Sequence, residues 1–215
     1  DGEHFQLPET HISAQPVGSK PEVWLAGDNP VIHRIAARRG YVPLITGRLL
    51  GAQYLSDMRQ TIEESWVAEG LDPGQMPLGI QRFMCVVDSH QEALEYLDNA
   101  RHQARLASNL RRREEVMDGS MLIEQPAHNE PTIDELEENL LVGDCETIAE
   151  RLCGEIRAAR PSHMMFHFQV GASSFKKALT SIEKFQTHIK PMVEKELGPL
   201  TELNNGGVSA QPVVA

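Results

Sequence analysis

The feature that most constrains this chain is an alternation of short apolar segments with longer amphipathic ones, repeated four times over 215 residues. The apolar segments are residues 22–26, 41–45, 78–87 and 163–169, and a helical pattern follows each of them. Short apolar strands that alternate with longer helices predict a parallel sheet covered by helices. Two architectures stay open at this point, a doubly wound open sheet and half of a (β/α)₈ barrel, because periodicity does not separate them.

The first repeat shows how the helices are delimited. Asp28 or Asn29 is a suitable N-cap residue after the turn at Gly27, and Pro30 suits the first helical turn because it has no N–H to leave unpaired. Gly40 is a natural stop at the other end. The sequence therefore predicts a strand, a short loop and a helix within about twenty residues.

The segment from residue 114 to about residue 141 interrupts the alternation. It contains two prolines and seven glutamates but few large apolar side chains. We interpret it as an insertion or a mobile loop within one domain that covers residues 1–198. Residues 199–215 are expected to form a disordered tail.

Composition and charge exclude several classes of protein. The net charge of −11 argues against a nucleic-acid partner, which a basic surface would attract. Cys85, Cys145 and Cys153 form no Cys-x-x-Cys pair, so neither a disulfide framework nor a metal site is predicted. No apolar run approaches the ~20 residues that a membrane helix needs, and we expect a cytoplasmic protein. The chain also lacks a Walker loop, a Gly-x-Gly-x-x-Gly motif, a nucleophile elbow and a His-Glu-x-x-His motif.

Three segments resemble the bacterial luciferase-like monooxygenases. Pro21-Glu-Val-Trp-Leu-Ala-Gly-Asp-Asn-Pro30, with Ala36-Ala37 and Gly40 after it, is similar to that family's fifth strand and the following loop and helix. Val142-Gly-Asp-Cys-Glu-Thr-Ile-Ala-Glu-Arg-Leu152 resembles the start of a later helix, and residues 181–192 resemble the closing helix. In order and spacing these segments fit across roughly residues 1–198.

The resemblance implies an α/β fold of the (β/α)₈ barrel type, of which this chain holds only the C-terminal half. A complete barrel domain has about 250 residues, so the first four strands would lie outside the chain. The resemblance also implies a flavin-dependent monooxygenase that uses reduced FMN and O₂ on a small organic substrate, or a related deazaflavin-dependent oxidoreductase. A flavin reductase would supply the electrons. The family's catalytic residues fall in the missing half, so no catalytic residue is assigned here.

The same resemblance implies where a cofactor phosphate would bind. The turn that contains Ala26, Gly27, Asp28 and Asn29, together with Val31, corresponds to the family's phosphate loop. Free N–H groups and the positive end of a helix suit an anion. This chain has Asp28 and Asn29 where the family usually has small hydroxyl residues, so Asp28 is equally well explained as a plain helix cap.

Three further residues are candidates for contact with the substrate or the flavin. Arg48 follows the second strand and could pair with an anion, or it could be an ordinary exposed loop arginine. In the last strand, alternation places His163, Met165, His167 and Gln169 on one face, and Met164, Phe166 and Phe168 on the other. We expect the mixed face to point into the barrel, with His167 and Gln169 near its rim. The alternative is that these histidines belong to a core or an interface. His163 and His167 would be about 13 Å apart along the strand, too far to share a metal ion.

Two other hypotheses remain open from the sequence. The chain could be a non-catalytic luciferase-like subunit or fragment that has lost flavin binding, or an unrelated half-barrel or open sheet that binds an anionic ligand. A half-barrel exposes two sheet edges and an apolar face. We therefore expect a homo- or hetero-oligomer, or poor solubility for the chain alone.

Overall fold

The computed structural model describes residues 3–4, 6, 8–9, 16–113, 115–128 and 130–203. Its secondary structure follows the predicted alternation. The strands are β1 (Trp24–Ala26), β2 (Val42–Arg48), β3 (Gly79–Val86), β4 (Val116–Asp118), β5 (Met121–Ile123), β6 (Leu141–Gly143) and β7 (His163–His167). The helices are α1 (Pro30–Arg39), α2 (Ala52–Ala68), α3 (His90–Arg112), α4 (Ile133–Asn139), α5 (Cys145–Ala159), α6 (Phe175–Lys184) and α7 (Lys190–Leu197), with a 3₁₀ turn η1 (Pro73–Gln75) and a π-helical turn η2 (Phe185–Ile189).

The main sheet is parallel, and β3 lies at its centre. Its strand order is β1-β2-β3-β6, and β7 also pairs with β3. The four predicted strands correspond to β1, β2, β3 and β7, which confirms the predicted parallel sheet, whereas the three-residue strand β6 was not predicted. Within the described residues β1 and β7 each pair with a single strand, so both keep one open edge.

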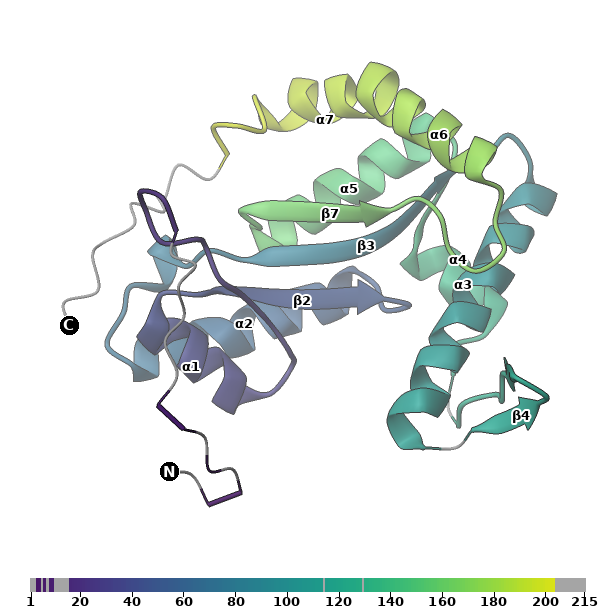
Figure 1. The fold of residues 1–215 in the computed structure, drawn as a ribbon. Helices are drawn as coiled ribbons and strands as arrows, with labels where there is room; N and C mark the ends of the chain where they lie inside the picture. Colours follow the sequence, from purple (N-terminus) through teal and green to yellow (C-terminus); the bar gives the residue numbers. More distant parts are fainter. Residues whose placement is uncertain are drawn as a thin grey trace.

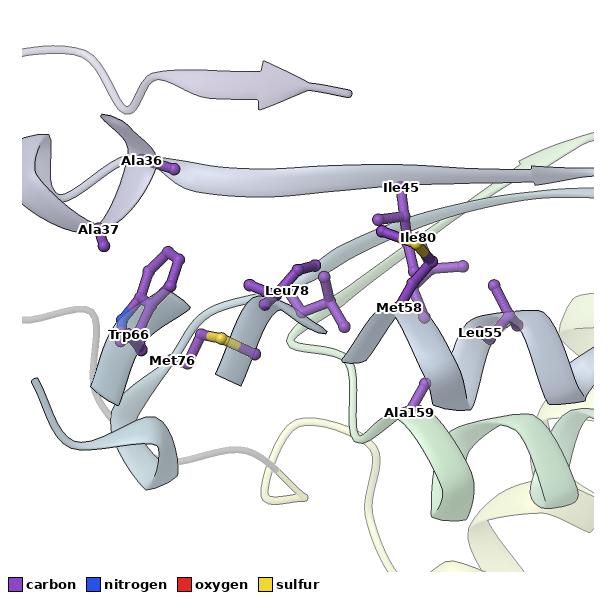
Figure 2. Close-up of a cluster of buried hydrophobic side chains, with 11 residues drawn as sticks. Ala36, Ala37, Ile45, Leu55, Met58, Trp66, Met76, Leu78, Ile80 and Ala159 are labelled. Carbon is purple, nitrogen blue, oxygen red and sulfur yellow. The ribbon is translucent and has the colours of Figure 1, made fainter. Parts of the chain in front are cut away.

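One face of the sheet is covered by α1, α2 and α5, as Figure 1 shows. Ile45 and Ile80 point from the sheet toward Leu55 and Met58 of α2 (Figure 2), and all four side chains are buried. This cluster also contains Ala36 and Ala37 of α1, Trp66 of α2 and Ala159 of α5. The four-residue apolar steps from Tyr54 to Trp66 therefore mark the face of α2 that meets the sheet, whereas Leu50, the first residue of the predicted stripe, precedes the helix and is exposed.

A second buried cluster joins the last strand to the C-terminal helices. Met164, Phe166 and Phe168 pack against α5, η2 and α7, and Phe166 lies 5.1 Å from Phe185 between ring centroids. The prediction that this apolar face meets the helices is confirmed. It follows that His167 belongs to the opposite face of the sheet, which we call the inner face.

At the amino-terminal end of the strands, the inner face is filled by an aromatic side chain lying over a glycine. A Cβ built on Gly79 would meet the Trp24 ring at 2.5 Å and a Leu44 methyl carbon at 3.2 Å. The Trp24 ring continues across to His163, with 4.8 Å between the ring centroids in an edge-on arrangement. The absence of a side chain at residue 79 is thus what allows Trp24 to bridge from β1 to β7.

At the carboxyl-terminal end, the inner face is covered by α3. Phe83 and Cys85 of β3 pack against Tyr96, Leu97 and Ala100 of α3, and all five side chains are buried. Figure 1 shows α3 running past the ends of β3 and β2. This helix begins at the N-cap Ser89, whose hydroxyl accepts from the Glu92 N–H.

The segment of residues 114–141, interpreted from the sequence as an insertion or mobile loop, contains regular structure. Strands β4 and β5 form an antiparallel hairpin, and α4 follows with a capping box between Thr132 and Glu135. Arg105 of α3 holds the segment through ion pairs to Glu130 and Glu124, the latter at 3.3 Å. Two of the glutamates that suggested a solvated loop, Glu124 and Glu130, therefore hold the segment against α3 by accepting from Arg105.

Packing against the helices continues further toward the C-terminus of the described chain than predicted. Leu200 contacts the cluster around η2 and α7, so the expected disordered tail does not begin at residue 199. Residues 204–215, the rest of that predicted tail, lie outside the described residues. None of the helices in the described ranges combines the length and the apolar character needed to cross a bilayer.

Two glycine substitutions test how the inner face is filled. Gly79→Val should lower the free energy of unfolding by about 2 kcal/mol, because the new side chain must displace the Trp24 ring. Gly154→Ala, within α5 where nothing lies within 4 Å of an added Cβ, should instead raise it by about 0.5–1 kcal/mol. Urea unfolding followed by circular dichroism measures both. Equal effects of the two substitutions would contradict the packing described for Trp24.

Candidate functional site

The loop between β1 and α1 is held by two short contacts. Asn29, not Asp28, is the N-cap residue, and its side-chain oxygen accepts from the Val31 N–H at 2.8 Å. The fully buried His33 places its Nε2 atom 2.9 Å from the Gly27 carbonyl oxygen, so Nε2 carries the proton and donates. These contacts fix the loop and leave the Asp28 carboxylate exposed at the carboxyl end of β1.

Asp28 contacts Tyr54, which lies in the first turn of α2 and thus follows the loop after β2. The Tyr54 hydroxyl is hydrogen-bonded to the Asp28 carboxylate, and Arg48 lies near enough to act on the same hydroxyl. Burial, reinforced by Asp28, raises the pKa of Tyr54, so the phenol remains protonated and donates. The structure therefore brings together Asp28 and Arg48, two residues predicted from separate loops.

Arg48 has an unusual backbone conformation at the end of β2. Its φ of 36° lies in the left-handed region, which is uncommon for a residue other than glycine, and the register with β3 shifts between Thr46 and Arg48. The neighbouring Gly47 has no room for a side chain, because a Cβ there would lie 2.5 Å from a guanidinium nitrogen of Arg82. The chain thus turns sharply against Arg82 and presents Arg48 to solvent.

Arg82 is a fully buried arginine in the middle of β3. Its guanidinium makes two hydrogen bonds to Glu155 of α5, at 3.0 Å and 2.7 Å, and also donates to the carbonyl oxygens of Leu50 and Asn139. The side-chain amide of Asn139 donates a hydrogen bond to the Leu49 carbonyl oxygen at 3.1 Å. Burial raises the pKa of the Glu155 carboxyl, and the Arg82 charge opposes that rise. One guanidinium therefore ties β3, the β2–α2 loop, α4 and α5 together.

On the inner face, His167 of β7 is hydrogen-bonded to the Gln81 side-chain amide of β3, and its ring lies 5.8 Å from the Phe83 ring. The Tyr96 hydroxyl of α3 donates to the His167 carbonyl at 2.8 Å. Burial lowers the pKa of His167 below its ordinary value of 6.5, so the ring is neutral at pH 7. With Gln81 donating to Nε2, the proton lies on Nδ1, which gives a neutral polar group under α3.

Arg48 and His167 lie at the same level on either side of β3. Arg48 pairs in register with Arg82, and His167 pairs with Phe83. Two strand spacings separate them, which corresponds to about 10 Å. Both residues therefore lie toward the carboxyl ends of their strands, with the backbone of β3 between them.

Gln169 does not join this group. Strand β7 ends at His167, and the exposed Gln169 side chain donates to the Ser173 carbonyl at 3.2 Å within the following turn. Across the described residues, no cluster of three or more histidine, cysteine, aspartate or glutamate side chains is arranged to hold a metal ion.

Sequence reasoning missed Tyr54, Gln81 and Arg82. Tyr54 was counted only as part of an apolar stripe, and Arg82 and Gln81 lie inside a strand that was identified from its apolar neighbours. A charged residue within a buried strand is itself a signal, because such a charge needs a partner. The sequence does not show that the partner is Glu155, 73 positions later.

A double substitution tests the buried ion pair. Arg82→Met should lower the free energy of unfolding by about 3–5 kcal/mol, because it leaves Glu155 buried without its partner. Arg82→Met combined with Glu155→Met should be less destabilised than Arg82→Met alone, since no charge then remains buried. Urea unfolding of the three proteins measures the coupling, and strictly additive losses would show that the two side chains act independently.

A pH titration tests the environment of His167. The NMR shift of its imidazole should give a midpoint below 6.5, because burial disfavours the charged ring. A depressed pKa in the folded state means that stability is lost as the pH falls below about 6.5, the unfolded value. The loss of stability at low pH should be smaller in His167→Gln. If the pH dependence of the free energy of unfolding is unchanged in this variant, the lowered pKa of His167 is contradicted.

Comparison with known proteins identifies the family to which the chain belongs. The sequence model of the luciferase-like monooxygenase family matches residues 1–162. The uncharacterized protein y4vJ of Sinorhizobium fredii (strain NBRC 101917 / NGR234) is 31% identical over 199 residues, which are 92% of this chain and 57% of that protein. The chain therefore spans little more than half the length of this relative.

Solved structures show the same fold at low sequence identity. An F420-dependent secondary alcohol dehydrogenase in complex with an F420-acetone adduct matches with a TM-score of 0.63 at 16% identity, over 90% of this chain and 55% of that one. The oxygenating constituent of 3,6-diketocamphane monooxygenase from Pseudomonas putida, in complex with FMN, matches with a TM-score of 0.53 at 16% identity, over 80% of this chain and 49% of that one. Such matches identify an α/β fold of the (β/α)₈ barrel type, present here as its C-terminal half. The chain belongs to the luciferase-like monooxygenase family.

Proposed function

We propose that this chain supplies the C-terminal half of the cofactor site of a flavin-dependent monooxygenase acting on a small organic substrate. The observation that carries the proposal is the placement of Arg48 and the neutral His167–Gln81 pair at one end of the sheet. Binding sites of barrel enzymes lie at this end of the strands. When bound, a reduced flavin supplies the activation of O₂ from which one oxygen atom passes to the substrate.

The amino-terminal end of α1 fits a cofactor phosphate less well than the family resemblance implies. Pro30 has no N–H, the Val31 N–H is already bonded to Asn29, and Asp28 adds a negative charge at the same place. A phosphate beside Asp28 would be repelled unless a cation offsets the carboxylate. Arg48 is the cation that acts on the same Tyr54 hydroxyl as Asp28. We therefore assign the anion contact to Arg48, with Ala26, Gly27 and the neighbouring loop as the surface beneath it.

The inner face fits the ring system of a flavin. Met165, which is exposed, and the half-buried His167 ring offer apolar surface, and the Gln81 amide and His167 Nδ1 offer polar groups. Because His167 is neutral, it can donate a hydrogen bond without adding a charge. These residues would bind and orient the ring, and α3 would exclude water from above it. The proton-transferring residues of the reaction would come from the other half of the barrel.

Two further proposals concern the source of electrons and the identity of the cofactor. A flavin reductase would deliver the reduced cofactor. FMN is the first candidate cofactor, and a deazaflavin is the second, since the similar structures are described with both kinds.

A second candidate function is a luciferase-like subunit that no longer binds flavin. The observation that favours it is the loop at Asp28, where the helix donors are occupied and the exposed side chain is acidic. In that case the sheet and α3 would be kept for packing against a catalytic partner.

Ligand titration distinguishes the two. FMN and riboflavin, which differ only in the phosphate, are added to the 215-residue chain, and flavin fluorescence is followed. We expect saturable quenching by both, with FMN bound more tightly. Arg48→Gln should weaken FMN binding about tenfold and leave riboflavin binding unchanged, because it removes only the anion contact.

Arg39→Gln is the matched control, since Arg39 is also an exposed arginine but lies at the far end of α1. Equal affinity for FMN and riboflavin would reject the Arg48 assignment and leave flavin binding intact. No binding of either flavin to the folded chain would favour the flavin-free subunit.

A further inference from the structure

The carboxylate of Asp28 is a charge without an ion-pair partner in the part of the chain that the structure describes. The side chain is exposed, and helix α1 is capped by Asn29 and not by Asp28. The Tyr54 hydroxyl donates to this carboxylate, which orients it without neutralising it. A negative charge is therefore held at the carboxyl end of β1, the end at which barrel enzymes bind their ligands.

Arg48 lies beside this carboxylate without pairing with it. Both side chains act on the Tyr54 hydroxyl, since Asp28 raises the pKa of Tyr54 and Arg48 lowers it. The ion pairs of the described residues nevertheless include no contact between Asp28 and Arg48. Strands β1 and β2 are neighbours in the sheet, so the two charges lie at adjacent strand ends. The rim between these strands therefore carries one negative and one positive charge.

The other charged or titratable groups of the neighbouring elements add little positive charge at this rim. His33 is fully buried, and its ring already donates to a carbonyl oxygen of the loop. Arg34 of α1 acts on Glu69, whose pKa it lowers. His167 is neutral at pH 7 and is separated from Arg48 by the backbone of β3. Arg48 is thus the cation that an anion at this place would contact.

The charge of the phosphate then decides how well a cofactor fits. A phosphate monoester such as that of FMN carries nearly two negative charges well above about pH 6, whereas a phosphodiester carries one. The second charge is attracted by Arg48 and repelled by Asp28, so these two effects largely offset each other. The cost of removing the phosphate from water rises steeply with its charge. With Asp28 present the second charge therefore lowers the affinity, and without Asp28 it raises the affinity.

We propose that Asp28 is a specificity-determining residue, which makes this site select a flavin whose phosphate carries one negative charge, as a phosphodiester does, over doubly charged FMN. The inference rests on the proposed function, which assigns the anion contact to Arg48, and it narrows the choice of cofactor. Asp28 acts through its charge on the phosphate that Arg48 binds, and it takes no part in the chemistry at the flavin ring. A small hydroxyl residue at this position would have no such effect, because it carries no charge.

Three ligands with the same ring system test this assignment: riboflavin, FMN and the monomethyl ester of FMN, whose phosphate is a diester. Binding to the 215-residue chain is followed by flavin fluorescence at about pH 8. The wild-type chain should bind the methyl ester about threefold more tightly than FMN. Asp28→Asn keeps an acceptor for the Tyr54 hydroxyl but removes the charge. FMN should then bind about threefold more tightly than the ester, with the affinity for riboflavin unchanged.

The pH and a matched variant separate the effect of charge from that of shape. At about pH 5.5 FMN has lost most of its second charge, so the wild-type chain should bind FMN and the ester equally within about twofold. The ratio of the two dissociation constants removes any contribution from titration of His33 and His167, which both ligands share. Asp57→Asn is the control, because Asp57 is also exposed, lies one turn after Tyr54 on α2 and has no ion pair among the described residues. It should leave that ratio unchanged.

Two kinds of failure can be told apart. If the wild-type chain binds riboflavin but prefers FMN to the ester at about pH 8, the role of Asp28 is overturned and the flavin site stands. The same holds if Asp28→Asn leaves the ratio of FMN to ester affinities unchanged, or if Asp57→Asn changes it equally. If the folded chain binds none of the three ligands, the proposed function fails and the inference fails with it.

Discussion

The arrangement of the loops and helices at the carboxyl ends of the strands depends on one buried guanidinium group, that of Arg82. Arg82 lies in the central strand and donates to a carboxylate on α5, to the loop after β2 and to the end of α4. Such a pair adds little net stability, because removing both charges from water is costly, but breaking it is more costly still. Its effect is therefore mainly geometric. The loop of residues 47–51, the helix α4 and the sheet are held in an arrangement in which these donors and acceptors are all paired.

The position of Arg48 follows from that constraint. Gly47 packs directly on the Arg82 side chain, and the next residue turns into the left-handed region. Backbone strain of this kind persists only where the surroundings fix it. On the other side of β3, the hydrogen bonds of Gln81 and Tyr96 fix His167 in a similar way. A rim cation and a neutral imidazole are thus held by rigid strands, although half of the barrel that would enclose them lies outside this chain.

Much of the main sheet was predictable, because the signal was the length and spacing of apolar runs. The runs at residues 41–45 and 78–87 correspond to β2 and β3, and the stripe from residue 54 to residue 66 is the face of α2 that packs on the sheet. Strands β4, β5 and β6 were missed because each has only three residues and lies within or at the end of the glutamate-rich segment that was interpreted as an insertion or mobile loop. The candidate site was predictable only residue by residue. Arg48 and His167 were identified from their places at strand ends, but their contacts with Tyr54, Gln81 and Arg82 join segments that are far apart in the sequence.

The lower part of the inner face bears on how sequences related to this one can differ. Trp24 extends from β1 over Gly79 to the ring of His163, so the three positions share one fixed volume on three strands. A homologue with a larger residue at the position of Gly79 has to carry a smaller one at the position of Trp24, or tilt its ring away from His163. Variation at these positions should accordingly be correlated, with glycine and tryptophan gained or lost together. The sizes of the side chains at these three positions should therefore change together during evolution, and not one position at a time.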